Sequence, residues 1–174
     1  HGEALEKYRL YGLGSVDIPD AQSLGARLEK DLAFAAADHA TARRHLTRAR
    51  DLYLAICRAS DPDWDRDVYE FNGVNAVTLS RLLADLGAVQ DVAERLLNFR
   101  PQDTYYSWAT KAEVLMATGA AAEKVSAALR HAQAKDAAGA DARLSTLAQL
   151  RRISAAHAAL ALLTRERRRR AHSG

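Results

Sequence analysis

The chain has 174 residues, 48% of them hydrophobic and only 6% aromatic, so it can bury the core of one domain mainly with alanine and leucine. This composition favours helices, because sheets favour β-branched and aromatic residues instead. The formal charge of +3 arises in residues 165–170, which hold five arginines and one glutamate. The rest of the chain is nearly neutral, with 20 basic and 21 acidic residues. The charge therefore argues against a domain that is basic throughout.

The apolar periodicity predicts a series of helices separated by glycine and proline. We expect a short helical turn within residues 1–11 and helices at about residues 19–37, 41–59, 74–86, 89–99, 104–118, 121–135 and 141–168. The breaks contain Gly12 and Gly14, the segment 61–64, Gly87, Pro101, Gly119 and Gly139. Helices of this length joined by short turns pack as antiparallel neighbours, so the sequence predicts an all-α fold.

Nothing in the sequence indicates a membrane or an oxidising compartment. No apolar stretch approaches the roughly 20 residues that span a bilayer, and the N-terminal residues do not form a signal peptide. The single cysteine, Cys57, lies in an apolar run and is expected to pack as a small hydrophobic residue. We therefore expect a cytoplasmic protein.

An internal repeat of the tetratricopeptide type is the main organising pattern. Its aromatic, small and glycine positions are best matched by Trp108, Ala112 and Gly119. The preceding unit places Ala76, Ser80 and Gly87 at the same positions, whereas near the N-terminus Lys30 breaks the rule for a small residue. An irregular helical bundle with coincidental alanines is the alternative.

The expected architecture is an α-solenoid of two or three tetratricopeptide-like units with a long C-terminal capping helix. It divides the chain into an N-terminal extension (1–20), a helical-repeat domain (21–164) and a basic tail (165–174).

Three segments go beyond a generic repeat: Val68–Leu79, Tyr105–Glu113 and Ala142–Ile153. They resemble the TRAF-binding, tetratricopeptide-like region of apoptosis-signal-regulating kinases and especially its bacterial relatives, most firmly over residues 69–153. The chain departs from the family signature where Asn72 replaces a proline and where Ser107 separates a tyrosine from Trp108. The resemblance implies a regulatory scaffold in a signalling or defence complex. It does not imply kinase activity, because the kinase motifs are missing.

Within the signature, Gly73 and Asn75 are expected where a loop enters a helix, with Asn75 capping free N–H groups. Trp108 is expected to fill the core between helices rather than to display a stacking surface. These roles are mostly structural.

The sequence predicts no metal site, no cofactor and no catalytic residues. The acidic run 61–67 resembles the start of a calcium loop, but Arg66 and Asn72 stand where an EF-hand needs glycine and glutamate. No histidine has the spacing of a local zinc site, and His157 is expected to be a hydrogen-bonded interface residue. Carboxylates brought together from distant helices leave a hydrolytic enzyme open as the third choice.

The arginine run is expected to be a solvated helix end or a tail. Its alternative role is to bind the phosphates of a nucleic acid, through Arg165, Arg167, Arg168, Arg169 and Arg170. No aromatic residues are interleaved with these arginines to stack on bases.

A partner is expected in the concave groove that the first helix of each repeat lines. The groove positions are filled by Arg27, Asp31, Phe34, Val77, Arg81, Asp85, Tyr106, Glu113 and Met116. This mixture suits an extended peptide or a partner helix, although an ordinary polar helix face has a similar composition. The sequence thus predicts a non-catalytic protein-interaction module, compatible with a homo-oligomer, with a nucleic-acid-associated helical protein as the alternative.

Overall fold

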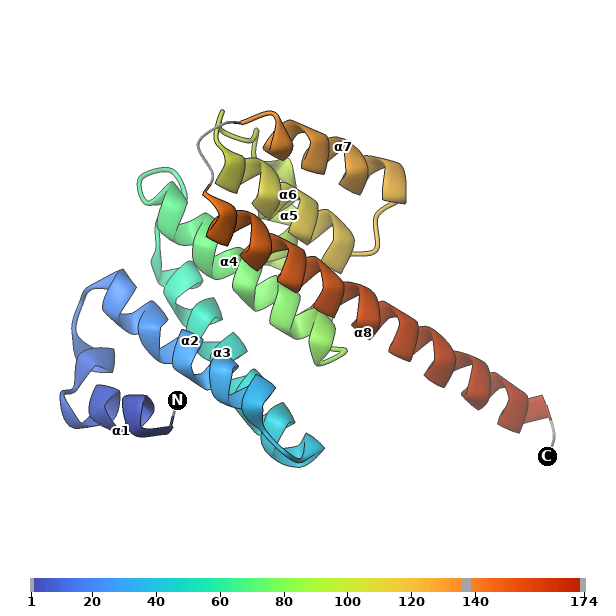
Figure 1. Ribbon diagram of the computed structural model, residues 1–174, viewed down its shortest axis with the longest axis horizontal. Helices are drawn as coiled ribbons and strands as arrows, with labels where there is room; N and C mark the ends of the chain where they lie inside the picture. The colour runs from blue at the N-terminus through green and yellow to red at the C-terminus, as the bar shows by residue number, and fades with distance from the viewer. Residues whose placement is uncertain (1, 136–138, 173–174) are drawn as a thin grey trace. The chain divides into compact units, whose positions relative to one another are not determined.

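The computed structural model describes residues 2–135 and 139–172, with side chains placed up to residue 159. Every regular element in these ranges is helical, which confirms the all-α fold (Figure 1). Two compact units divide the chain at residues 100 and 101. The first contains α1 (Gly2–Leu10), η1 (Leu13–Ser15), α2 (Pro19–Ala35), α3 (His39–Ala59), α4 (Arg66–Leu82), η2 (Leu86–Val89) and α5 (Gln90–Asn98). The second contains α6 (Tyr105–Ala117), α7 (Ala122–Gln133) and α8 (Ala140–His172).

Local signals in the sequence explain where several helices begin. Pro19 occupies the first turn of α2, where its missing N–H group costs nothing. Asp38 caps α3, because its carboxylate accepts a hydrogen bond from the Thr41 N–H at 2.8 Å. Thr104 caps α6 in the same way, through a 3.2 Å bond from the Ser107 N–H. Such signals made most of the predicted boundaries accurate to a few residues.

The expected start of the fourth helix was wrong. α4 begins at Arg66 rather than near residue 74, so Gly73 and Asn75 lie inside the helix instead of at its entry. Asn75 therefore caps no helix: its amide donates to the Phe71 carbonyl, one turn earlier, at 2.8 Å. The helix also ends before the predicted glycine, because Ala84 adopts the left-handed conformation (φ 58°) that closes it.

Close packing around Gly73 holds the first unit together. α3 packs against both α2 and α4, and α4 packs against α5. A Cβ atom on Gly73 would lie 3.1 Å from side-chain atoms of Val92 and Leu96 and 3.3 Å from the Cys57 sulfur. The lack of a side chain at residue 73 therefore lets α3, α4 and α5 meet closely.

Two polar contacts connect α2 to α4 across this unit. The Ser23 hydroxyl donates to the Asn72 side-chain oxygen at 2.8 Å, and the Lys30 ammonium donates to the Asn75 side-chain oxygen at 2.7 Å. Both asparagines are buried, and each uses its amide group on a carbonyl of α4 itself. The cost of burying these asparagines is therefore offset, because the side-chain oxygen of each accepts a hydrogen bond from α2 and its amide group donates one within α4.

The short helix α1 is attached to α2 by one aromatic contact and one ion pair. Gly25 allows Tyr8 to lie against α2, since a Cβ atom at this position would be 2.6 Å from the tyrosine ring. Arg9 donates to the carboxylate of buried Glu29 at 3.0 Å, and His45 of α3 lies 2.6 Å from the other oxygen. Tertiary contacts of this kind are needed because a helix of nine residues is only marginally stable in water when it is isolated.

The thiol of Cys57 is part of the core of the first unit. The side chain is fully buried, and the thiol donates to the Tyr69 carbonyl at a sulfur–oxygen distance of 3.7 Å. Burial raises the pKa of Cys57 to about 12, so the thiol stays protonated at neutral pH. The expected packing role of this cysteine is confirmed.

In the second unit, α6 packs against both α7 and α8. Tyr105, Ala109 and Ala132 form a buried cluster, against which Trp108 and Ala142 pack from its edge. Further along α8, Ile153 is completely buried, whereas Leu144 is exposed. Alanine at the helix contacts permits close approach, as the composition suggested.

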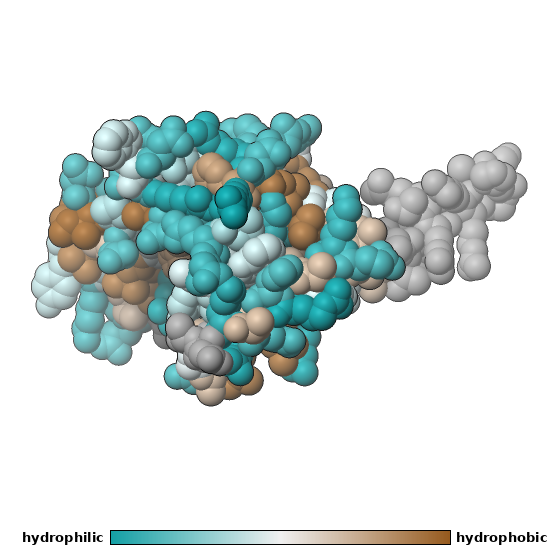
Figure 2. All heavy atoms as spheres, turned by 90° about the horizontal axis from the view of Figure 1, so that it is seen from above, coloured by the Kyte–Doolittle hydropathy of each residue, from teal (hydrophilic) through white to brown (hydrophobic). Residues whose placement is uncertain are grey.

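Within the described residues, none of the helices has the length and apolar character needed to cross a membrane. Figure 2 shows apolar side chains in several separate groups among hydrophilic ones on one face of the molecule.

Candidate functional site

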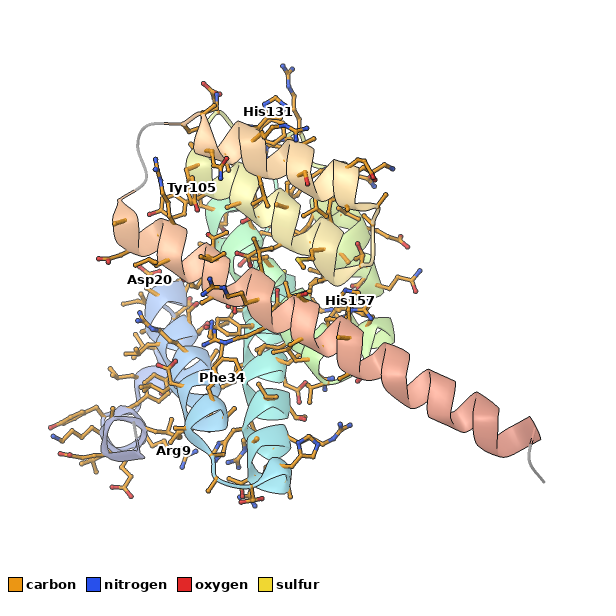
Figure 3. The ribbon with its side chains drawn as sticks, turned by 45° about the vertical axis from the view of Figure 1, so that its right-hand side comes forward. Arg9, Asp20, Phe34, Tyr105, His131 and His157 are labelled. Carbon is orange, nitrogen blue, oxygen red and sulfur yellow. The ribbon has the colours of Figure 1, made fainter. Side chains whose placement is uncertain are left out.

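The best-defined candidate site lies in the first unit, where side chains of α2, α3 and α4 meet. We call it the α2–α4 face and define it by Arg27, Lys30, Asp31 and Phe34 of α2, Tyr53 of α3, and Phe71 and Asn75 of α4. The α2 members recur at three- and four-residue intervals, so they share one side of that helix. Figure 3 shows Phe34 near the C-terminal end of α2.

Lys30 is the centre of this face. Its ammonium group bonds to Asn75 and also lies 5.5 Å from the centroid of the Tyr53 ring, within the range of a cation–π contact. The ring of Tyr53 in turn meets Phe71 edge to face, with centroids 6.2 Å apart. One lysine and two aromatic rings thus connect three helices.

The hydroxyl of Tyr53 is an unusual feature of the centre. The side chain is fully buried, and its oxygen has no hydrogen-bond partner among the described residues. Burial raises the pKa of Tyr53; positively charged Arg27 opposes the increase, while Asp31 adds to it. The hydroxyl therefore stays protonated and can donate a hydrogen bond.

The rim of the α2–α4 face is accessible. Arg27 is exposed, and the side chains of Phe34 and Phe71 are 39% and 52% exposed, although large aromatic residues usually bury more of their surface. Asp31 is half-buried beside them. The face therefore combines a buried polar centre with exposed aromatic edges.

The structure places the predicted groove residues of the first unit in different environments. Arg27, Asp31 and Phe34 share one side of α2, as the repeat pattern predicted. Val77 is fully buried, so its side chain does not line an accessible surface. Arg81 is half-buried, and burial lowers its pKa.

Asp85 does not belong to the helix to which the repeat pattern assigned it. It follows the end of α4, and its carboxylate accepts a 2.7 Å ion-paired hydrogen bond from Arg50 of α3. The pattern failed here because α4 ends at Leu82, earlier than the sequence suggested.

The predicted residues of the second unit also differ in accessibility. Tyr106 is exposed and meets Tyr105 edge to face, whereas Glu113 is buried. Met116 is half-buried, and its carbonyl oxygen lies 2.8 Å from Nε2 of His157 on α8 (Figure 3). This contact confirms that His157 is a hydrogen-bonded residue between helices.

Trp108 lies at the edge of the core rather than in its centre. It is half-buried and stacks on exposed His131 of α7, with ring centroids 4.3 Å apart and planes 21° from parallel. The stack closes one end of the α6–α7 pair.

Replacing Trp108 with alanine should lower the free energy of unfolding by about 1–2 kcal/mol, because a half-buried ring contributes less than a fully buried one. Urea denaturation of the full chain measures this change. Replacing His131 with alanine should cost no more than about 1 kcal/mol, the usual value of one aromatic pair. A loss of 4 kcal/mol or more for the tryptophan variant would place the ring inside the core and contradict the observed exposure.

The arginine run is only partly described. Its backbone belongs to α8, but the side chains of Arg165, Arg167, Arg168, Arg169 and Arg170 lie outside the described residues. Their role as a phosphate-binding group stays a prediction.

Sequence reasoning missed Lys30, Tyr53 and Phe71 as members of a site. Lys30 carried a usable signal, because a lysine at a position reserved for small residues must direct its charge to some partner. Tyr53 carried none, since it stands in an apolar run on the second helix of its repeat. Within the described residues, no three histidine, cysteine, aspartate or glutamate side chains gather as metal ligands would.

No protein-family model matches the chain, and comparisons with curated proteins and with solved structures gave no match either.

Proposed function

We propose that this chain is a non-catalytic protein-interaction module that binds an extended segment of a partner on the α2–α4 face. The observation that carries the proposal is the presence of two exposed aromatic side chains, Phe34 and Phe71, on the same face as the polar centre at Lys30 and the exposed Arg27. Aromatic residues and arginine are the side chains most enriched where proteins bind one another.

The arrangement of the helices supports a tetratricopeptide-like repeat as the scaffold of this module. Successive helices pack in pairs, α2 with α3, α4 with α5, and α6 with α7, and α8 follows as a cap. Ser80 and Ala112, which occupy the first predicted small position of their units, are both fully buried. Together with the signature segments, this supports a relationship to the TRAF-binding region of apoptosis-signal-regulating kinases and a regulatory role in a signalling or defence complex.

The chemistry of the face fits binding better than catalysis or nucleic-acid recognition. Its polar groups are mainly donors, and its one carboxylate, Asp31, has no histidine, serine or cysteine of the face beside it to activate. Asp31 would also repel a phosphate backbone, which favours surfaces of uniform positive charge. A protein partner tolerates such a mixture of signs.

The proposal is tested by comparing partner binding of matched charge reversals, Arg27→Glu and Arg43→Glu. Both arginines are exposed, but Arg43 lies on α3 outside the face. Affinity purification from the native host with the parent chain identifies the partner, and calorimetry then measures each variant. Arg27→Glu should weaken binding about tenfold, or 1.4 kcal/mol, while Arg43→Glu leaves it unchanged.

Equal binding by the two variants would place the partner elsewhere on the molecule. Melting curves of both variants provide the control for folding, because exposed positions rarely change stability by more than about 0.5 kcal/mol.

A further inference from the structure

Trp64 is the most exposed large hydrophobic side chain among the described residues, with 87% of its surface accessible. It lies in the turn between α3 and α4, outside the α2–α4 face, and we call residues 61–67 the Trp64 segment. Tryptophan usually buries most of its surface, and it is one of the residues that contribute most to binding between proteins. The exposure of Trp64 therefore indicates that another molecule covers its ring.

Hydrogen bonds within the turn hold the backbone of Trp64 in place. The Asp61 carbonyl accepts hydrogen bonds from the Trp64 N–H at 3.2 Å and from the Asp65 N–H at 2.7 Å. The Asp61 carboxylate accepts another from the Asp63 N–H at 2.9 Å, and the ring of Pro62 fixes one more backbone angle. Because the turn is ordered before a partner arrives, binding loses little conformational entropy there.

The surroundings of Trp64 are acidic. Four aspartates of the segment are exposed: Asp61, Asp63, Asp65 and Asp67. Among the described residues, the four carboxylates make one ion-pair contact, at 3.8 Å between Asp63 and Arg95. Arg66, the one basic residue of the segment, donates to the carboxylate of Glu70 at 2.6 Å. The exposed tryptophan therefore lies in a field that attracts cations and repels anions.

The chain itself contains a segment of complementary charge. Residues 165–170 hold five arginines and one glutamate, a net charge of +4. Their backbone belongs to the last turns of α8, which extend beyond α6 and α7, the other helices of the second unit (Figure 1). Residue 165 follows the buried Ile153 by 12 positions, which is about 18 Å along a helix. The arginine run therefore lies away from the core of its own unit.

We propose that the arginine run of one copy binds the Trp64 segment of a second copy, so that the protein associates head to tail. Guanidinium groups stack on the face of tryptophan and form paired hydrogen bonds with carboxylates, and the Trp64 segment offers both. Its four aspartates balance the net charge of the run. This interface is independent of the proposed function, because it shares no residue with the α2–α4 face.

The first arm of the test measures the mass of the full chain, freed of nucleic acid, by sedimentation. A contact between two different surfaces produces rings or open chains, so the average mass should rise with concentration between about 10 μM and 1 mM. Exposed charges are strongly screened at about 1 M salt, so the protein should return to a monomer there. A monomer at every concentration in low salt would overturn the proposal.

The second arm compares three variants of the full chain. Trp64→Ala should weaken association about tenfold. Replacing the five arginines of the run with glutamine should abolish it, and glutamine preserves α8 because its helix propensity is close to that of arginine. Tyr11→Ala removes an equally accessible aromatic side chain outside the interface and should associate like the parent. Melting temperatures should stay within a few degrees of the parent, because all the described positions changed are exposed.

Mixing the two impaired variants tests whether the interface is head to tail. The glutamine variant keeps an intact Trp64 segment, and Trp64→Ala keeps an intact arginine run. Together they should form a complex of one copy each at concentrations where neither associates alone, and the complex should not grow further. If the mixture stays monomeric while the parent associates, or if Trp64→Ala associates as well as the parent, the arginine run binds elsewhere and the proposal is wrong.

Discussion

Replacing Gly73 with valine should lower the free energy of unfolding by about 2–3 kcal/mol. The first added carbon alone would come within 3.1 Å of Val92 and Leu96 and 3.3 Å of Cys57, and all three neighbours are buried. Valine adds two further methyl groups to this space, and overpacking of a core typically costs 1–3 kcal/mol. The higher helix propensity of valine returns only a few tenths of a kcal/mol. Urea denaturation followed by circular dichroism measures the difference.

Gly87→Val is the matched control for this variant. A Cβ atom on Gly87 meets nothing within 4 Å, so the same chemical change should alter stability by no more than about 0.5 kcal/mol. If the two variants were equally stable, α3, α4 and α5 would not meet closely at residue 73, and the packing described for the first unit would be wrong.

Replacing Ile153 with alanine should destabilise the second unit by about 3 kcal/mol. Ile153 is completely buried on α8, and isoleucine-to-alanine changes in cores cost 2–5 kcal/mol through lost contacts and the cavity that remains. The magnitude tests whether α8 belongs to a packed core or only lies alongside it. Denaturant unfolding of the full chain gives this value, provided that the slope of the transition is unchanged.

Leu144→Ala on the same helix provides the comparison. Its side chain is 62% exposed, so removing it should cost about 0.5 kcal/mol or less. Comparable losses for both variants would show that the two sides of α8 are equally buried, and would contradict the observed orientation of the helix.

The sequence predicted the helices well where local chemistry determines them. Pro19, Asp38 and Thr104 begin helices for reasons that involve only their own turn, and Gly119 ends α6 because its φ of 81° favours glycine. Amphipathic periodicity added the approximate length of each helix. These features require no knowledge of the rest of the fold.

The start of α4 was not predictable from local chemistry. Glycine and asparagine disfavour helix interiors, so Gly73 and Asn75 pointed to a loop. Tertiary contacts outweigh this preference: Gly73 is needed for close packing with α3 and α5, and Asn75 is held by Lys30. The partners are 15 or more residues away, and a pattern within one segment does not contain that information.

The candidate site was predictable only along one helix. The repeat pattern correctly grouped Arg27, Asp31 and Phe34, because residues three and four apart share a helix face. It did not include Tyr53 and Phe71, whose contact depends on how α3 and α4 pack. It also placed buried Val77 in the groove, since a repeat position does not determine which neighbour covers it.

The two hydrogen bonds between α2 and α4, Ser23 with Asn72 and Lys30 with Asn75, join residues separated by 49 and 45 positions. In an open repeat array each hairpin can melt independently, because it contacts only its immediate neighbours through local interfaces. Here the loss of α2 would leave the buried side-chain oxygens of Asn72 and Asn75 in α4 unpaired, and the loss of α4 would take away the acceptors of Ser23 and Lys30 in α2. The three helices from α2 to α4 should therefore lose their structure in a single cooperative step, without a populated intermediate in which only one hairpin is folded.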